Sequence, residues 1–212
     1  MSALLDLLYP PRCILCRAFL PDGKEPVCDK CATALLREQP VIRRGKKYDL
    51  CVSPFVYVGK LRESLHRYKF GGRKFYAKTY GKWLAACIRR ELDGQYDLLT
   101  WVPVSRKRLR KRGYDQARLL CEQTAAQLGV QAVCCLEKVA DNPAQSSLSS
   151  AESRESNVKQ MYRASDPARF AGRRVLLIDD IVTTGATIGE CARVLRAAGA
   201  AKVVCASLAA VT

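Results

Sequence analysis

The chain has 212 residues, of which 49% are hydrophobic. This length suits one α/β domain with a small additional module and is too short for two full enzyme domains. The hydrophobic content supports a packed core and excludes wholesale disorder. Lys and Arg number 36 against 20 Asp and Glu, a formal net charge of +16 at pH 7. Such a charge predicts affinity for a polyanion, which could be nucleic acid, an anionic membrane surface or a phosphorylated small molecule.

The sequence contains no membrane-spanning segment, because no apolar run approaches the about 18 residues that a transmembrane helix needs. The N-terminal residues Met1 to Asp6 lack a basic region and carry an acid within their apolar stretch, unlike a signal peptide. We therefore expect a cytoplasmic protein.

Four of the eleven cysteines form two Cys-x-x-Cys pairs, separated by eleven residues. Two residues between cysteines let both thiolates of a knuckle reach one ion, and two knuckles complete a tetrahedral sulfur site typical of structural Zn2+. The alternatives are redox pairs or incidental buried thiols, but a thioredoxin-type pair follows a strand, opens a helix and occurs once. The predicted zinc ligands are Cys13, Cys16, Cys28 and Cys31.

This zinc ribbon or knuckle module is expected to occupy residues 1–48, with a basic linker over residues 37–49, and a second domain is expected over residues 49–212. The other seven cysteines lie among Val, Leu and Ala, and we predict that they are buried small apolar residues. They are Cys51, Cys87, Cys121, Cys134, Cys135, Cys191 and Cys205.

Strand and helix patterns alternate through the second domain. Patterns of β-branched and apolar residues predict strands at 51–58, 98–104, 132–136, 175–178 and 203–208. Helical spacing of apolar residues predicts helices at 61–68, 74–92, 114–128 and 187–198. This alternation indicates a parallel sheet covered by helices on both faces. The Ser-rich stretch 141–153 is the best candidate for a mobile loop.

One helix carries a stripe of lysines that is separate from its apolar face. Lys74, Lys78 and Lys82 form it, and they indicate either a solvated surface or a track for a polyanion. Aromatic residues on the same helix are predicted to belong to the core rather than to stack on bases.

The strongest chemical signal is the segment Val175 to Thr187. An apolar strand ends in Asp179 and Asp180, a loop of hydroxyls and glycine follows, and a helix begins at once. Loop amides and a helix N-terminus attract phosphate, while adjacent carboxylates can accept hydrogen bonds from vicinal hydroxyls or hold hydrated Mg2+. The plain alternative is a strand end with acids and a Thr cap. A P-loop nucleotide hydrolase is disfavoured because the chain contains no GxxxxGK[ST] motif.

This segment resembles the PRPP-binding signature of type I phosphoribosyltransferases. The resemblance implies a type I phosphoribosyltransferase-like α/β fold, in which Asp179 and Asp180 bind the ribose 2′ and 3′ hydroxyls and Mg2+ accompanies PRPP. It also implies that the loop binds the 5′-phosphate through Thr183, Thr184, Gly185, Ala186 and Thr187.

Two further stretches, together with the paired cysteines, resemble the ComF/GntX family of competence-associated proteins over essentially the whole chain. They run from Val102 to Gln116 and from Asn142 to Val158. The resemblance implies that Val104 and Ser105 face the pyrophosphate and that residues 145–157 close over the site. Where this family usually has Arg-Gly-Phe-Asn-Gln, the chain has Tyr114 and Asp115, so Arg112 and Gln116 are better candidates for ligand contacts than Asp115.

Neutralising the departing pyrophosphate would require basic groups near it. The candidates for this catalytic role are Arg106, Lys107 and Arg112. His66 is the one histidine of the sequence, and we expect it to be structural.

Two functions follow from these patterns. The first is binding of PRPP or a related ribose 5-phosphate by a protein that handles single-stranded DNA during competence and DNA uptake, with proteins of the competence machinery as possible partners. The alternative is an active phosphoribosyltransferase with a small-molecule acceptor. The sequence leaves turnover open.

Overall fold

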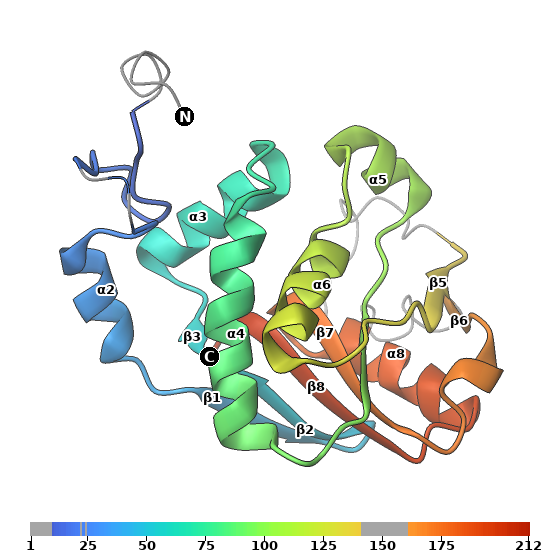
Figure 1. Ribbon diagram of the computed structural model, residues 1–212. Coiled ribbons are helices and arrows are strands. Elements are labelled where there is room, and N and C mark those ends of the chain that lie inside the picture. The colour runs from blue at the N-terminus through green and yellow to red at the C-terminus, as the bar shows by residue number, and fades with distance from the viewer. Residues whose placement is uncertain (1–9, 22, 24, 141–160) are drawn as a thin grey trace.

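The computed structural model describes residues 10–21, 23, 25–140 and 161–212, and its centre is a six-stranded sheet (Figure 1). The strands are ordered β1-β2-β8-β7-β4, and the short β3 also pairs with β8. β1 and β2 are antiparallel, whereas the other described pairs in this sheet are parallel. The strands are β1 (Val41–Gly45), β2 (Tyr48–Ser53), β3 (Phe55–Val56), β4 (Leu98–Trp101), β7 (Arg174–Val182) and β8 (Lys202–Ala210).

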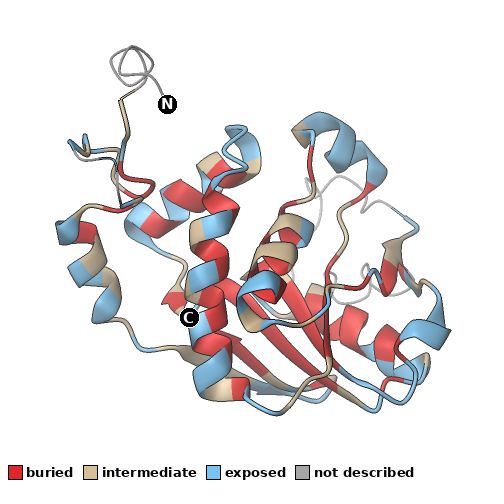
Figure 2. Ribbon diagram, in the orientation of Figure 1, coloured by how far each residue is buried: buried red, intermediate tan, exposed pale blue. Residues whose placement is uncertain are grey.

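Helices cover both faces of the sheet, and the side chains of β7 show this directly. Leu176 and Ile178 pack with the core under α3, α4 and α6, whereas Val175 and Leu177 pack with the core under α8. Such alternation is expected of a central strand buried on both sides. Figure 2 shows the buried residues concentrated on the central strands and on the inner sides of the helices. The helices are α3 (Gly59–Phe70), α4 (Tyr76–Leu92), α6 (Gln116–Leu128) and α8 (Ala186–Ala197).

The four helices predicted from apolar spacing are confirmed, and the sheet with its covering helices confirms the expected α/β class. None of the described helices combines the length and the hydropathy that crossing a membrane requires. The prediction of a strand at 132–136 was wrong in its extent, because in the main sheet Ala132 forms only an isolated bridge with Leu99. The chain then leaves the main sheet, and β5 (Leu136–Lys138) pairs antiparallel with β6 (Tyr162–Ala164). The Ser-rich loop predicted at 141–153 lies outside the described residues.

The basic linker predicted over residues 37–49 is instead largely a β-hairpin. β1 and β2 pair through it, with Val41 opposite Ser53 and Arg43 opposite Cys51. β1 forms one edge of the sheet, where charged side chains can face solvent without breaking the strand. The basic composition of this segment therefore favoured a linker, although the segment forms a strand. The proposed boundary after residue 48 stays a prediction.

The N-terminal module lies against α3 and shares its core. Cys13, Ile14 and Leu15 belong to the same buried cluster as Leu65 of α3. α3 also presents Arg67 to the same segment, and its Nη2 donates to the carbonyl oxygens of Ile14 at 3.0 Å and of Leu15 at 2.7 Å. The backbone between Cys13 and Cys16 is thus tied to a helix of the second domain. The one described helix of the module itself is α2 (Asp29–Leu36).

Candidate functional site

Asp179 and Asp180 lie in β7 just beyond the last residue of β4. The final pair between these strands joins Trp101 to Ile178, while β7 continues beside β8 to Val182. The strand was predicted to end at these acids, but it continues past them to Val182. Because β4 stops one residue earlier, both carboxylates line a cleft at the carboxyl end of the parallel strands, the usual ligand position in open α/β sheets.

The two carboxylates have different surroundings. Asp180 Oδ1 lies 2.8 Å from Lys69 Nζ, and the Asp180 side chain is only 11% exposed. Asp179 Oδ1 accepts a hydrogen bond from the backbone N–H of Asp180 at 2.8 Å. Burial and the neighbouring Asp180 carboxylate raise the pKa of Asp179 to about 8. The pair therefore holds less negative charge than two free aspartates would.

The loop after β7 forms a small hollow directly beside Asp179. Residues 183–187 line it, and α8 begins within it at Ala186. Gly185 has a φ of +80°, in the left-handed region, and a Cβ there would lie 3.3 Å from the Tyr48 hydroxyl oxygen. Thr184 Oγ1 accepts from the backbone N–H of Ala186 at 3.3 Å. The helix start and its unpaired amides suit an anion such as phosphate.

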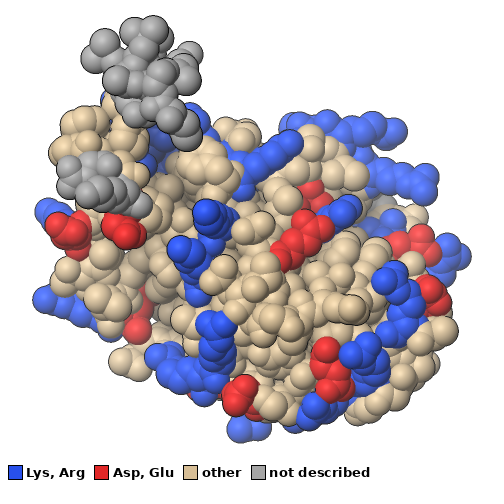
Figure 3. All heavy atoms as spheres, in the orientation of Figure 1, with Lys and Arg blue, Asp and Glu red and all other residues tan. Residues whose placement is uncertain are grey.

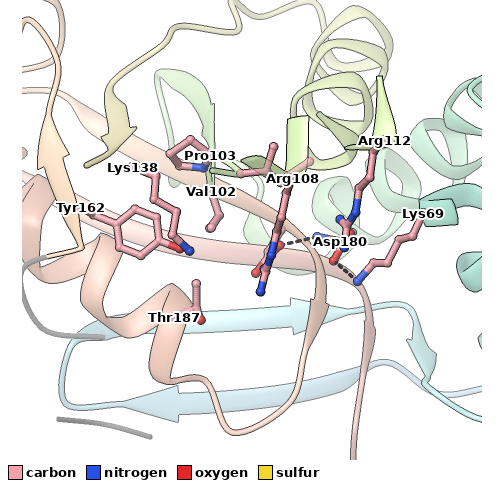
Figure 4. A pocket seen from close by; sticks show the side chains of 12 residues that line it. Lys69, Val102, Pro103, Arg108, Arg112, Lys138, Tyr162, Asp180 and Thr187 are labelled. Atoms are coloured by element: carbon pink, nitrogen blue, oxygen red, sulfur yellow. Dashed lines mark hydrogen bonds and ion pairs between the residues drawn. The ribbon is translucent and has the colours of Figure 1, made fainter. Parts of the chain in front are cut away.

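Basic side chains from three different elements line the cleft around the acids (Figure 4). Arg108 and Arg112 come from α5 (Arg106–Arg112), Lys69 from the last turn of α3, and Lys138 from β5. Figure 4 shows Lys69 reaching Asp180 from one side and Lys138 with Tyr162 on the opposite side. This arrangement can hold several anionic oxygens next to a pair of carboxylates.

The helical phase of α5 separates its basic residues into two groups. Arg108 and Arg112 are four residues apart, so they share one face and line the cleft. Arg106 and Lys107, predicted for a catalytic role together with Arg112, are exposed and are not among the cleft-lining residues. Ser105 caps the helix by accepting from the N–H of Arg108 at 3.3 Å, and only Val104 of the predicted Val104–Ser105 pair lines the cleft.

The four predicted zinc ligands come together in one cluster. Their sulfur atoms all lie within 4.8 Å of one another, the one group of possible metal ligands of this kind in the described part of the chain. Four thiolates fit a closed tetrahedral site for structural Zn2+. Six of the remaining cysteines are buried as predicted, but Cys134 is exposed.

Two families of domains match the chain. Residues 115–211 match the phosphoribosyl transferase domain, and residues 4–45 match the double zinc ribbon domain. The chain is 27% identical over 219 residues to the DNA utilization protein YhgH of Escherichia coli (strain K12), covering 93% of this chain and 96% of that protein. It is 25% identical over 198 residues to the competence protein ComFC of Bacillus subtilis (strain 168), covering 89% and 73%. The chain is thus similar over most of its length to proteins named for DNA utilization and competence.

A second ComF-type relative is the competence protein F of Haemophilus influenzae (strain ATCC 51907 / DSM 11121 / KW20 / Rd), 27% identical over 216 residues and covering 89% of this chain and 92% of that protein. Among solved structures, the glutamine PRPP amidotransferase of B. subtilis complexed with ADP and GMP has a TM-score of 0.45 and 23% identity. The match covers 66% of this chain but only 29% of the amidotransferase. The adenine phosphoribosyltransferase of Thermoanaerobacter pseudethanolicus has a TM-score of 0.40 and 20% identity, covering 64% and 70%.

The phosphoribosyl transferase match contains the acids and the loop but not every residue of the cleft. Lys69, Arg108 and Arg112 precede residue 115 and lie outside it. Three of the four basic residues that line the cleft therefore come from the segment between the two matched ranges, and the fourth, Lys138, comes from within the phosphoribosyl transferase match.

Asp115 and Gln116 do not line the cleft but hold residues that do. Asp115 accepts from the backbone N–H of Val104 at 3.1 Å and of Arg118 at 3.0 Å, so it caps α6 and ties down the loop after β4. Gln116 is fully buried, and its Oε1 accepts from Arg112 Nη1 at 2.7 Å. Gln116 was predicted as a ligand contact, but its amide instead holds Arg112, whose guanidinium also stacks over Phe70 at 4.6 Å.

Sequence reasoning missed Lys69, Arg108, Lys138 and Tyr162 as lining residues. Spacing within α5 could have identified Arg108, because it shares a helical face with Arg112. The other three come from elements that only the fold brings together.

A broad basic surface lies outside the cleft. Figure 3 shows Lys and Arg side chains gathered over α5, and Arg106, Lys107, Arg110 and Lys111 are exposed there. The predicted stripe of Lys74, Lys78 and Lys82 is also exposed. His66 is exposed as well, with its ring 4.8 Å from that of Phe70.

Proposed function

We propose that this protein binds PRPP or a related ribose 5-phosphate in the cleft at the end of β7. The observation that carries the proposal is that Asp179 lines both the hollow formed by residues 183–187 and the adjoining cleft, where the basic residues of α3, α5 and β5 surround the two acids. A sugar with a phosphate at one end and a pyrophosphate at the other has this same order of groups.

Each part of the ligand has a counterpart in the cleft. The amides of the loop and the start of α8 take the 5′-phosphate, and the carboxylates of Asp179 and Asp180 accept hydrogen bonds from the ribose hydroxyls. Arg112 and Arg108 neutralise the pyrophosphate, next to the backbone of Val104. Arg106 and Lys107, which do not line the cleft, are better suited to the basic surface than to this role.

The donor set also fits a divalent cation. Carboxylate oxygens are the ligands that Mg2+ takes together with water and phosphate oxygens, so Asp179 and Asp180 would hold it. When bound, Mg2+ supplies charge neutralisation for the pyrophosphate.

Calorimetry with PRPP, in the presence and absence of Mg2+, tests this proposal. Wild type is expected to bind, and the Asp179→Asn/Asp180→Asn double variant is expected to lose about tenfold or more in affinity, because charge-assisted hydrogen bonds to the ribose are lost. Asp93→Asn, at an exposed position after α4, is the matched control. A folded double variant with wild-type affinity would place the ligand elsewhere.

We further propose that the exposed basic surface binds single-stranded DNA, and that proteins of the competence machinery are its partners. Relatives named for DNA utilization and competence support this assignment. A groove or track of Lys and Arg that follows the backbone is the usual mode of such binding. Because α5 contributes to both the cleft and the basic surface, PRPP is expected to compete with an oligonucleotide. Independent binding of the two ligands would contradict a shared use of α5.

An active phosphoribosyltransferase with a small-molecule acceptor is the alternative function. In that reaction the bond between C1 of the ribose and pyrophosphate breaks, its electron pair leaves with pyrophosphate, and the acceptor forms a new bond to C1. The combination of acids and basic residues in one cleft favours this alternative. Release of pyrophosphate from PRPP in the presence of an acceptor, lost in the double variant, would establish it.

A further inference from the structure

Lys69 occupies an unusual position for a basic residue of an anion-binding cleft. Its ammonium is 2.8 Å from Asp180 Oδ1, and its side chain is only 19% exposed. Asp180 also faces Arg112 across the cleft: burial lowers the pKa of the Arg112 guanidinium, and the Asp180 carboxylate opposes that change. One of the two acids assigned to the ribose is therefore already neutralised by a side chain of the same protein.

The end of α3 that carries Lys69 is held firmly. The preceding residue, Tyr68, is fully buried, its hydroxyl donates to the Gln116 carbonyl at 2.8 Å, and its own carbonyl accepts from the Tyr114 hydroxyl. The residue before Tyr68, Arg67, donates to the backbone of the zinc knuckle. The backbone at Lys69 is thus fixed, while its four-carbon side chain keeps the freedom to point its ammonium at different partners.

A carboxylate in a close, partly buried ion pair is a poor ligand for a metal ion that arrives alone. Displacing the ammonium would leave it without its partner inside a cleft that already contains Arg108, Arg112 and Lys138. A sugar phosphate changes this balance, because its anionic oxygens offer the ammonium a new partner at the moment when Asp180 is needed by the ribose.

We propose that Lys69 is a ligand-exchange residue of the cleft. In the free protein its ammonium neutralises Asp180 and keeps a lone divalent cation out, and on binding it moves to the anionic oxygens of the sugar phosphate. This rests on the proposed function and deepens it: Lys69 is a binding residue, and the cation enters with the sugar phosphate rather than before it.

Two readouts separate this role from a purely structural ion pair. Mn2+ binding to the free full-length protein, followed by electron paramagnetic resonance, reports whether Asp180 is available to a cation. PRPP affinity, followed by calorimetry, reports whether the ammonium contributes to ligand binding. Lys69→Met is expected to tighten Mn2+ binding by about tenfold and to weaken PRPP binding by about tenfold, opposite changes that simple destabilisation does not produce.

Three further variants complete the experiment. Lys69→Arg keeps the positive charge of the side chain and is expected to keep Mn2+ binding weak. Lys69→Met/Asp180→Asn is expected to lose the gain in Mn2+ affinity, which assigns that gain to Asp180. Lys60→Met, at an exposed position on the same helix, is the control for loss of one positive charge. Lys69→Gln replaces Lys69→Met if the latter does not fold.

The outcomes distinguish the inference from the proposed function. If wild type binds PRPP and Lys69→Met changes neither affinity, the exchange role is wrong while the proposed function stands. If wild type does not bind PRPP, the proposed function is wrong, and so is the proposed movement of the Lys69 ammonium to the sugar phosphate. Mn2+ binding to wild type as tight as to Lys69→Met would also overturn the inference, because Asp180 would then be available despite its ion pair.

Discussion

The guanidinium of Arg43, on edge strand β1, donates through Nη1 to the carbonyl oxygen of Thr183 at 2.6 Å, across 140 residues of sequence. A second bond joins Arg43 to the carbonyl of Val211, beyond the end of β8. The hairpin thereby holds the start of the loop that we assign to the 5′-phosphate. On the same hairpin, Tyr48 lies beside Gly185 in the middle of that loop.

Arg43→Met is expected to weaken PRPP binding by about three- to tenfold, because a charged donor to a loop carbonyl contributes about 1 kcal/mol when it is partly exposed. Calorimetry measures the affinity. The neighbouring Arg44→Met is the control, since Arg44 is exposed on the same strand. Equal effects of the two changes would show that general charge, and not the position of the loop, is responsible.

Gln116→Leu is expected to lower PRPP affinity without any direct loss of a ligand contact. The change removes the acceptor that holds Arg112 Nη1 at 2.7 Å and leaves the guanidinium free to turn away from the cleft. The free energy of unfolding should fall by about 1–3 kcal/mol, because a buried polar network loses a partner. Chemical denaturation and calorimetry measure the two effects. Gln116→Glu, which keeps the acceptor, should retain more PRPP affinity than Gln116→Leu does, and the reverse order would contradict this role.

Asp179→Asn is expected to stabilise the free protein more at high pH than at low pH. Burial and Asp180 raise the pKa of Asp179 to about 8. Between the ordinary pKa of an aspartate, about 4, and this value, the folded protein retains a proton that the unfolded chain has released. The free energy of unfolding of wild type therefore falls through this window as pH rises, and the variant lacks that contribution.

Thermal denaturation at about pH 5 and about pH 8.5 checks this expectation, with the difference in Tm between variant and wild type larger at the higher pH. The same Tm difference at both values would mean that Asp179 is ionised in the folded protein throughout.

Loss of zinc is expected to destabilise the whole chain and not only its N-terminal module. Cys13 and Cys31 belong to the buried cluster that also contains residues of α3, α4 and α6. Elemental analysis should give about one zinc per chain, by the four-ligand rule, and Cys13→Ser should lower it sharply together with the Tm. Cys134→Ser, at the exposed cysteine, is the matched control. Full retention of zinc in a Cys13→Ser/Cys28→Ser double variant would reject the site.

Binding of single-stranded DNA is expected to weaken steeply with salt. The logarithm of the binding constant should fall against that of the salt concentration with a slope of about −0.7 for each phosphate neutralised. Lys78→Ala and Lys82→Ala, on the exposed stripe of α4, should each reduce the number of phosphates neutralised by about one while leaving PRPP binding intact. Arg112→Ala should weaken both ligands. A flat salt dependence would favour the small-molecule phosphoribosyltransferase instead.

The two acids, the loop at residues 183–187 and the four clustered cysteines could be predicted from sequence because each belongs to a local pattern. Asp179 to Thr187 are contiguous, so a strand, a tight loop and a helix start suffice to bring them together. Two cysteine pairs at short spacing similarly need little of the fold to form one cluster.

Other parts of the cleft depend on contacts that no local pattern contains. Arg43 contacts Thr183 only because β1 and β7 belong to one sheet, and the basic residues around Arg43 favoured a linker. Arg108 was overlooked in favour of Arg106 and Lys107 because the cap at Ser105, which sets the phase of α5, was not recognised. The phase of this short basic helix cannot be obtained from charge alone, since six of its seven positions carry Lys or Arg.

The contacts of α3 limit how far the zinc ribbon and the phosphoribosyl transferase domain of this chain can be exchanged separately for those of a relative. Arg67 binds the zinc knuckle and Lys69 binds Asp180, two residues apart on the same helical turn. Each residue turns an α-helix by about 100°, so a single insertion or deletion between these positions would remove one contact or the other. A chimera carrying the zinc ribbon of one relative and the transferase domain of another must therefore preserve this helical turn residue for residue. The zinc knuckle and the cleft contact fixed, neighbouring positions of α3. The two domains of this chain should therefore be transferred together.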